Sequence, residues 1–204
     1  MKDREIRSFA LDEIRIEERA GKKLIRGHAA VFNQLSEDLG GFREQIAPGA
    51  FAEAITTDDI RALFNHNADY VLGRNLAKTL ALSEDARGLA IEIEPPDTQV
   101  ARDLMVSMSR GDITQMSFGF TVRPNGQNWA KADDGTVVRT LTRVRLYDVS
   151  PVTYPAYPQT DVAVRELRAW QEGQNAGVAA VAAAAWEAEQ RRLKFLRCRL
   201  ALEA

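Results

Sequence analysis

Apolar residues recur at every second position in many short runs of this chain, a period typical of β-strands. Residues 116–121 alternate large apolar with small side chains, and residues 60–66 place Ile60, Ala62 and Phe64 at every second position. The same kind of pattern predicts strands over residues 4–17, 23–32, 42–46, 71–73, 79–83, 88–94 and 136–149. Short helices are predicted over residues 50–57 and 99–110. Many short strands with inserted helices predict a mainly β fold of the α+β class, with a closed or sandwiched β core.

The composition changes abruptly after Arg165. Residues 166–204 are rich in alanine, glutamate, arginine and leucine and contain no proline. Such a segment favours a helix over a strand. The sequence therefore predicts two parts, a β domain over residues 1–165 and a helical extension over residues 166–204.

Charge and cysteine content exclude several function classes. The formal net charge of -2 gives no electrostatic reason to expect a nucleic-acid partner. A single cysteine, Cys198, excludes an internal disulfide and a cysteine-rich zinc site. Neither a metal-ligand spacing nor a phosphate-binding glycine loop is present, so no metal and no cofactor are expected. The longest apolar run, residues 178–186, is about half a membrane span, and residues 1–5 are charged, so we expect a cytoplasmic protein without a membrane partner.

One histidine and one serine lie in strand-like contexts that suit nucleophilic catalysis. His66 ends the alternating run 60–66, on the face that carries Ile60, Ala62 and Phe64. Ser117 follows 51 residues later, on the small and polar face of its strand. A histidine beside a serine can take the hydroxyl proton as the serine attacks a carbonyl carbon. The alternatives are a serine on a solvated strand face and a strand-end histidine bonded to a loop carbonyl. His28, the other histidine, is the weaker candidate.

Asp148 is the best candidate for a third member of the site. It shares a strand face with Val144 and Leu146 in a continuous alternation, so it is expected to point inward. A buried carboxylate needs a partner, and a histidine N–H is one, while Arg143 or Arg145 would serve equally well. A second possibility is a hydrolase that uses Ser150 as its nucleophile beside Asp148.

Taken in order, several segments resemble the prohead proteases of tailed bacteriophages, the serine proteases that mature the capsid. The resemblance covers about residues 20–165. It is carried by residues 27–33 (GHAAVFN), 42–51 (FREQIAPGAF), 63–66 (LFNH), 71–74 (VLGR), 101–104 (ARDL), 110–112 (RGD), 116–120 (MSFGF) and 149–157 (VSPVTYPAY).

This resemblance implies a fold similar to the herpesvirus assemblins, a closed β-barrel ringed by helices. It also implies that His66 and Ser117 are catalytic. The assemblins place a second histidine after the serine, but this chain has no histidine beyond His66. Asp148 is therefore the expected replacement.

The resemblance further implies a serine endopeptidase whose substrates are the scaffold protein, the major capsid protein and the protease itself. Such an enzyme works in the host bacterial cytoplasm, inside the immature prohead. The alternative is a catalytically silent capsid-assembly or scaffolding protein with the same fold. The extension after residue 165 lies outside the resemblance. It could dock on scaffold or capsid protein, pair with another copy, be removed by self-cleavage, or pack on the barrel as a solvated helix.

Overall fold

The computed structural model describes residues 4–10, 14–19, 21–154 and 161–202. The chain divides into two compact units, Met1–Thr160 and Asp161–Ala204, and each is described by itself. The first unit contains all the described strands, β1 to β12, and two short helices, α1 (Ala52–Thr57) and α2 (Gln99–Ser109). The fold is therefore mainly β with few helices, as the alternating sequence predicts.

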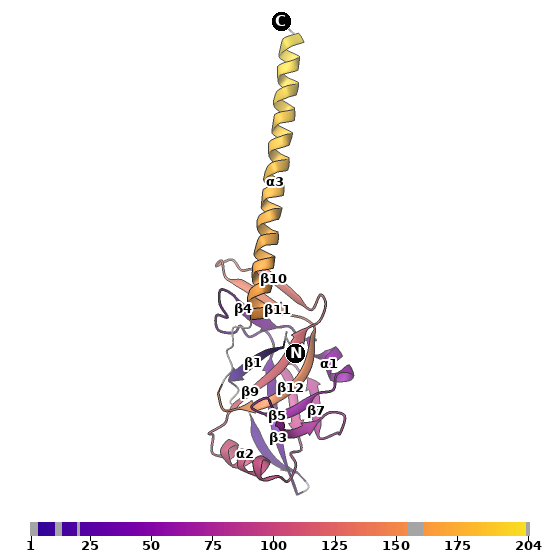
Figure 1. Cartoon of the computed structure of the whole chain (residues 1–204), viewed down its shortest axis with the longest axis vertical. Helices are drawn as coiled ribbons and strands as arrows, with labels where there is room; N and C mark the ends of the chain where they lie inside the picture. Colours follow the sequence, from indigo (N-terminus) through magenta and orange to yellow (C-terminus); the bar gives the residue numbers. More distant parts are fainter. Residues whose placement is uncertain (1–3, 11–13, 20, 155–160, 203–204) are drawn as a thin grey trace. The chain divides into compact units, whose positions relative to one another are not determined.

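The strands of the first unit form three sheets (Figure 1). The largest sheet has the order β1 (Glu5–Ala10), β9 (Gln115–Val122), β12 (Val144–Val152), β5 (Arg61–Phe64) and β6 (Asn67–Arg74). A second sheet has the order β2 (Arg15–Arg19), β3 (Lys22–Val31), β8 (Gly88–Ile93) and β7 (Leu80–Glu84). The third has the order β10 (Gln127–Lys131), β11 (Val137–Leu141) and β4 (Arg43–Ile46). The strand order of each described sheet is open, with two edge strands.

Residues 4–17 do not form the one strand that their alternation predicts. They contribute to β1 and β2, which belong to different sheets: β1 pairs with β9, and β2 pairs with β3. Side-chain alternation continues across the division, so the period alone could not reveal where the chain changes sheets.

The core of the first unit is one apolar cluster that draws residues from all three sheets and from both helices. Phe118 belongs to this cluster and is fully buried. Its ring meets that of Phe51 edge-on at 5.5 Å and stacks on that of Phe120 at 5.0 Å. The large face of β9 is thus buried in the core, which leaves the Ser117 face pointing the other way.

A buried network of four charges fastens β1 to the neighbouring sheet. Arg139 of β11 is 0% exposed and donates to Glu5 at 2.8 Å and to Glu44 at 2.9 Å. Arg7 of β1 donates to the same two carboxylates at 2.8 Å each. Two guanidinium groups therefore neutralise two carboxylates, and β1 contributes one of each. This arrangement joins β1 to the β10–β11–β4 sheet.

Replacing Arg139 with methionine should destabilise the first unit by about 3–5 kcal/mol, because it leaves two buried carboxylates to share one guanidinium. Urea unfolding followed by circular dichroism measures the loss. Arg110→Met is the matched control, since Arg110 pairs with Asp112 on the surface, and it should change the unfolding free energy little. Equal midpoints for the two variants would contradict the importance assigned to the network.

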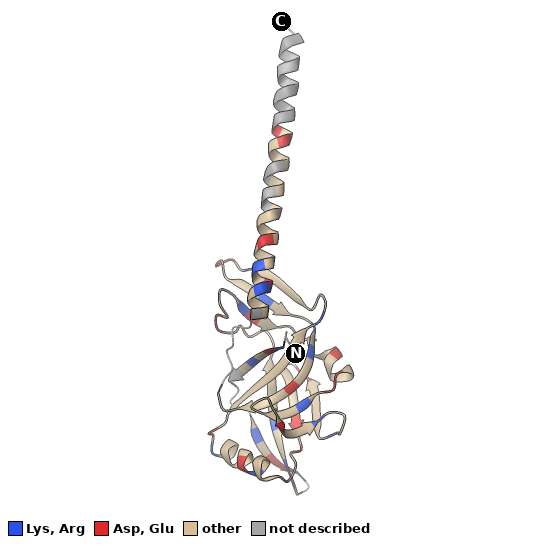
Figure 2. Cartoon of the chain, viewed as in Figure 1, with Lys and Arg blue, Asp and Glu red and all other residues tan. Residues whose placement is uncertain are grey.

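The second unit is one helix, α3 (Asp161–Leu202). It begins five residues before the extension predicted over 166–204. Residues 173–186 carry no charged side chain, and this stretch is tan or grey in Figure 2. Among the described residues, no helix is both long enough and apolar enough to cross a membrane.

Candidate active site

His66 lies in a tight turn and not on a strand face. Strand β5 ends at Phe64, and Phe64 pairs with Asn67 at the start of β6. The two residues between them, Asn65 and His66, both have positive φ, 53° and 57°. A two-residue hairpin turn of type I′ needs positive φ at both central positions, and asparagine and histidine tolerate it better than most side chains. The turn carries the imidazole beyond the strand end, which corrects the expected placement on the Ile60 face.

Asn65 fastens this turn to the end of β12. Its side-chain amide donates to Thr153 Oγ1 at 3.1 Å and its carbonyl accepts from the Thr153 N–H at 2.9 Å. Its backbone N–H donates to the Pro151 carbonyl at 3.0 Å. The imidazole next to Asn65 is therefore held at a fixed place relative to β12.

A β-bulge at Tyr147 decides which way Asp148 points. Leu146 pairs with Phe120 and Asp148 pairs with Gly119, so Tyr147 has no counterpart on β9. The extra residue reverses the alternation, and Asp148 lies on the face opposite to Leu146. The expectation that these two residues share a face is therefore wrong. The bulge brings the carboxylate to the face of β9 that carries Ser117.

Ser117, His66 and Asp148 form one hydrogen-bonded chain. Strands β9 and β12 pair Ser117 with Ser150, which places both serines and Asp148 on the same face. His66 Nε2 lies 2.7 Å from Ser117 Oγ, and His66 Nδ1 lies 2.5 Å from Asp148 Oδ2. Ser117 and Asp148 are buried, while the His66 side chain is 12% exposed. This is the geometry in which a carboxylate orients an imidazole toward a serine hydroxyl.

A second acceptor competes for the Ser117 proton. Ser117 Oγ also lies 2.9 Å from the backbone carbonyl of Arg7 in β1. A hydroxyl has one proton, so it donates to this carbonyl or to a neutral His66, but not to both.

The solvated-face interpretation of Ser117 is excluded, because the residue is 0% exposed.

The Asp148 carboxylate has two further partners. Ser150 Oγ donates to Asp148 Oδ2 at 2.8 Å, and the Arg4 guanidinium pairs with Asp148 Oδ1. Neither Arg143 nor Arg145, the cations considered from the sequence, has this position: Arg143 pairs with Glu53 and Arg145 lies over the Tyr147 ring. Because both oxygens accept hydrogen bonds, the free-energy cost of burying this carboxylate is offset and its rotation is restricted.

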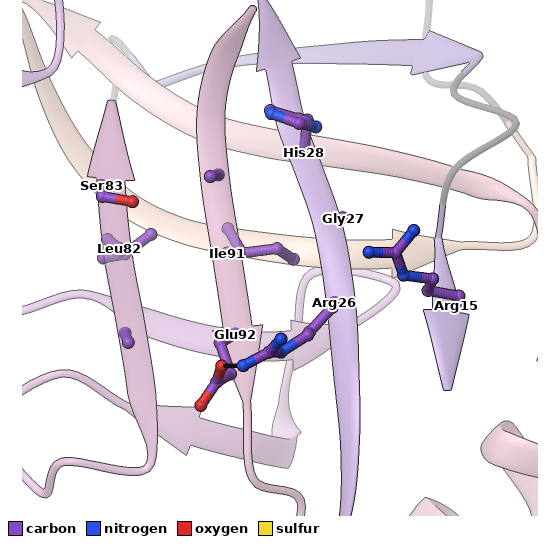
Figure 3. A pocket seen from close by; sticks show the side chains of 10 residues that line it. Arg15, Arg26, Gly27, His28, Leu82, Ser83, Ile91 and Glu92 are labelled. Carbon is purple, nitrogen blue, oxygen red and sulfur yellow. Dashed lines mark hydrogen bonds and ion pairs between the residues drawn. The ribbon is translucent and has the colours of Figure 1, made fainter. Parts of the chain in front are cut away.

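His28 lies apart from the hydrogen-bonded residues Ser117, His66 and Asp148. It belongs to the lining of a cavity of about 360 Å³ on the β2–β3–β8–β7 sheet, where β8 separates it from Ser83 (Figure 3). His28 Nε2 is 2.8 Å from Asp85 Oδ2. This bond, together with backbone N–H donors, lowers the pKa of Asp85 to about 2. His28 thus fixes a turn. Its backbone and that of Ser83 lie on either side of β8, two strand spacings apart, which together amount to about 10 Å.

The comparison with known proteins decides the family. A model of the caudovirus prohead serine proteases matches residues 11–174. The chain belongs to this family. It is therefore a serine peptidase of phage capsid maturation, and the catalytically silent assembly protein, one of the alternatives expected from the sequence, is disfavoured. The matched residues include His66, Ser117, Asp148 and Ser150, and exclude β1.

One solved structure is similar to this prohead protease. The bacteriophage T4 capsid assembly protease aligns over 75% of this chain and 98% of its own, with a TM-score of 0.47 and 9% sequence identity. No curated protein sequence matches the chain.

Sequence reasoning missed three residues that contact the members of the hydrogen-bonded chain or hold them in place. Asn65 had a usable signal, since asparagine is favoured in two-residue hairpin turns. Ser150 was considered from the sequence only as a nucleophile, so its hydrogen bond to Asp148 was not expected. Arg4 gave no signal, because 144 residues separate it from Asp148.

Proposed function

We propose that Ser117 is the nucleophile, His66 the general base and Asp148 the residue that orients His66. The observation that carries this assignment is the unbroken Ser117–His66–Asp148 chain, with contacts of 2.7 and 2.5 Å. The Asn65–His66 turn and the Tyr147 bulge support it, because each departs from regular strand geometry and each brings one member into the chain.

The reaction follows the acyl-transfer scheme of serine peptidases. Ser117 Oγ bonds to the carbonyl carbon of the scissile peptide while its proton moves to His66 Nε2. Asp148 accepts the Nδ1–H bond and stabilises the imidazolium. The tetrahedral intermediate expels the amine, which takes the proton from His66 Nε2. Water then repeats the sequence on the acyl-enzyme and releases the carboxylic acid.

The substrates that we propose are the phage scaffold protein, the major capsid protein and the protease itself. Support comes from the family, whose members mature the phage prohead. We also propose that the enzyme acts inside the immature prohead in the host cytoplasm. The extension over residues 166–204 is proposed to dock on scaffold or capsid protein, to pair with another copy or to be removed by self-cleavage.

We further propose that the β domain, residues 1–165, closes into an assemblin-like barrel. Its support is that one apolar cluster draws on all three sheets, and that the buried charges join β1 to β4 and β11.

Co-expression with the cognate scaffold and capsid proteins tests the substrates. The wild-type chain should convert both to shorter products with defined new termini, which mass spectrometry identifies, and Ser150→Ala should still do so because Ser150 only supports Asp148. Intact scaffold and capsid proteins beside a folded wild-type protease would contradict these substrates.

A further inference from the structure

We infer that Arg4 is a positioning residue of the catalytic centre that holds the Asp148 carboxylate in the rotation that His66 requires. The inference rests on the proposed roles of Ser117, His66 and Asp148. Arg4 and strand β1 precede the residues matched by the family model, 11–174, so membership of the family does not assign it.

The contacts of Arg4 are directed at Asp148. Its Nη2 pairs with Asp148 Oδ1, and among the described residues its buried Nε has no hydrogen-bond partner. The opposite oxygen, Oδ2, accepts from His66 Nδ1 and Ser150 Oγ. Each carboxylate oxygen therefore has its own donors. Without Arg4 the carboxylate would lose the donor that opposes rotation about its Cβ–Cγ bond.

Gly119 is an independent sign that space is reserved for this pair. A Cβ atom at this position would lie 2.5 Å from Arg4 Nη2 and 2.5 Å from Asp148 Oδ1. Both distances are well inside van der Waals contact, so a larger residue would push the guanidinium and the carboxylate apart. Since Gly119 stands directly opposite Asp148 in the β9–β12 register, the absence of a side chain there is what admits the guanidinium.

Strand β1 delivers Arg4 to this place. Ile6 of β1 pairs with Gly119 of β9, and the buried Glu5–Arg7–Glu44–Arg139 network prevents β1 from sliding. The Arg4 guanidinium carbon also lies 5.9 Å from the centre of the Tyr147 ring, the bulged residue beside Asp148. The bulge and β1 therefore both help to position the Asp148 carboxylate.

The sign of the effect separates positioning from simple charge. A cation beside Asp148 opposes the formation of a second cation on His66, so charge alone would make Arg4 inhibitory. Positioning predicts the opposite, because an imidazole held off its productive geometry loses rate. Removing Arg4 should therefore slow the chemical step.

The test measures how fast an alkyl fluorophosphonate labels purified full-length protein. In this reaction Ser117 Oγ bonds to phosphorus, fluoride leaves and the hydroxyl proton passes to His66. Arg4→Gln should lower the maximal labelling rate roughly 10- to 100-fold, with the half-saturating probe concentration unchanged. Arg4→Lys should recover part of the rate. Arg145→Gln is the matched control, because Arg145 also lies over the Tyr147 ring but is exposed, and it should label at the wild-type rate.

A second readout does not depend on reaction rate. The downfield proton resonance of the His66 Nδ1–H bond to Asp148 should move or broaden in Arg4→Gln and stay in place in Arg145→Gln. Wild-type or faster labelling by folded Arg4→Gln, or an unmoved resonance, would overturn the role of Arg4. If folded Asp148→Asn labels at the wild-type rate, the proposed catalytic roles themselves fail, and the two failures are thereby distinguished.

Discussion

Replacement of Ser117 by alanine is expected to abolish proteolysis while leaving the fold intact. The change removes one buried oxygen and its bonds to His66 Nε2 and to the Arg7 carbonyl. Loss of the nucleophile from a serine peptidase lowers kcat by on the order of 10⁶-fold. Purified variant should leave capsid and scaffold proteins at full length over days, as followed by gel electrophoresis and mass spectrometry.

Ser150→Ala is the matched control, since Ser150 lies opposite Ser117, is equally buried and donates a hydrogen bond to the Asp148 carboxylate. We expect it to cleave more slowly than wild type but far faster than Ser117→Ala. Normal cleavage by Ser117→Ala together with loss of cleavage in Ser150→Ala would transfer the nucleophile's role to Ser150.

An Asp148→Asn variant is expected to fold and to lose up to about 10⁴-fold in kcat. The amide keeps the shape of the carboxylate, but it lacks the charge that stabilises the imidazolium, and its NH₂ group would face the His66 Nδ1–H or the Arg4 guanidinium. Steady-state cleavage of a capsid-derived substrate measures the loss, and circular dichroism verifies the fold.

The chain offers a matched control in its second histidine–aspartate pair. Asp85 contacts His28 at 2.8 Å, away from Ser117, and Asp85→Asn should leave kcat at the wild-type value. Near-normal turnover by folded Asp148→Asn would remove Asp148 from the mechanism, and an equal loss in both variants would point to a general effect on the fold.

The sequence predicted the β character of the fold and named the three residues of the proposed site. It did not predict the local geometry of two of them. Alternation identifies strands, and it placed Ser117 on the small face of β9 correctly. It misplaced Asp148 because one unpaired residue, Tyr147, reverses the alternation. It misplaced His66 because periodicity does not reveal where a strand stops and a turn with positive φ begins.

Contacts between distant strands leave no local pattern at all. Arg4 and Asp148 are separated by 144 residues, and Glu5 and Arg139 by 134. Both contacts depend on the antiparallel pairing of β1 with β9. The continuous alternation over residues 4–17 predicted one strand instead. The position of β1 beside the site therefore required the structure.

The most direct test of the account is to find which residue an alkyl fluorophosphonate modifies. After labelling, proteolysis and mass spectrometry of the wild-type chain, we expect one adduct, on Ser117, and none in a His66→Ala variant. An adduct on Ser150, or equal labelling of Ser117 with and without His66, would contradict the assignment of Ser117 as a nucleophile activated by His66.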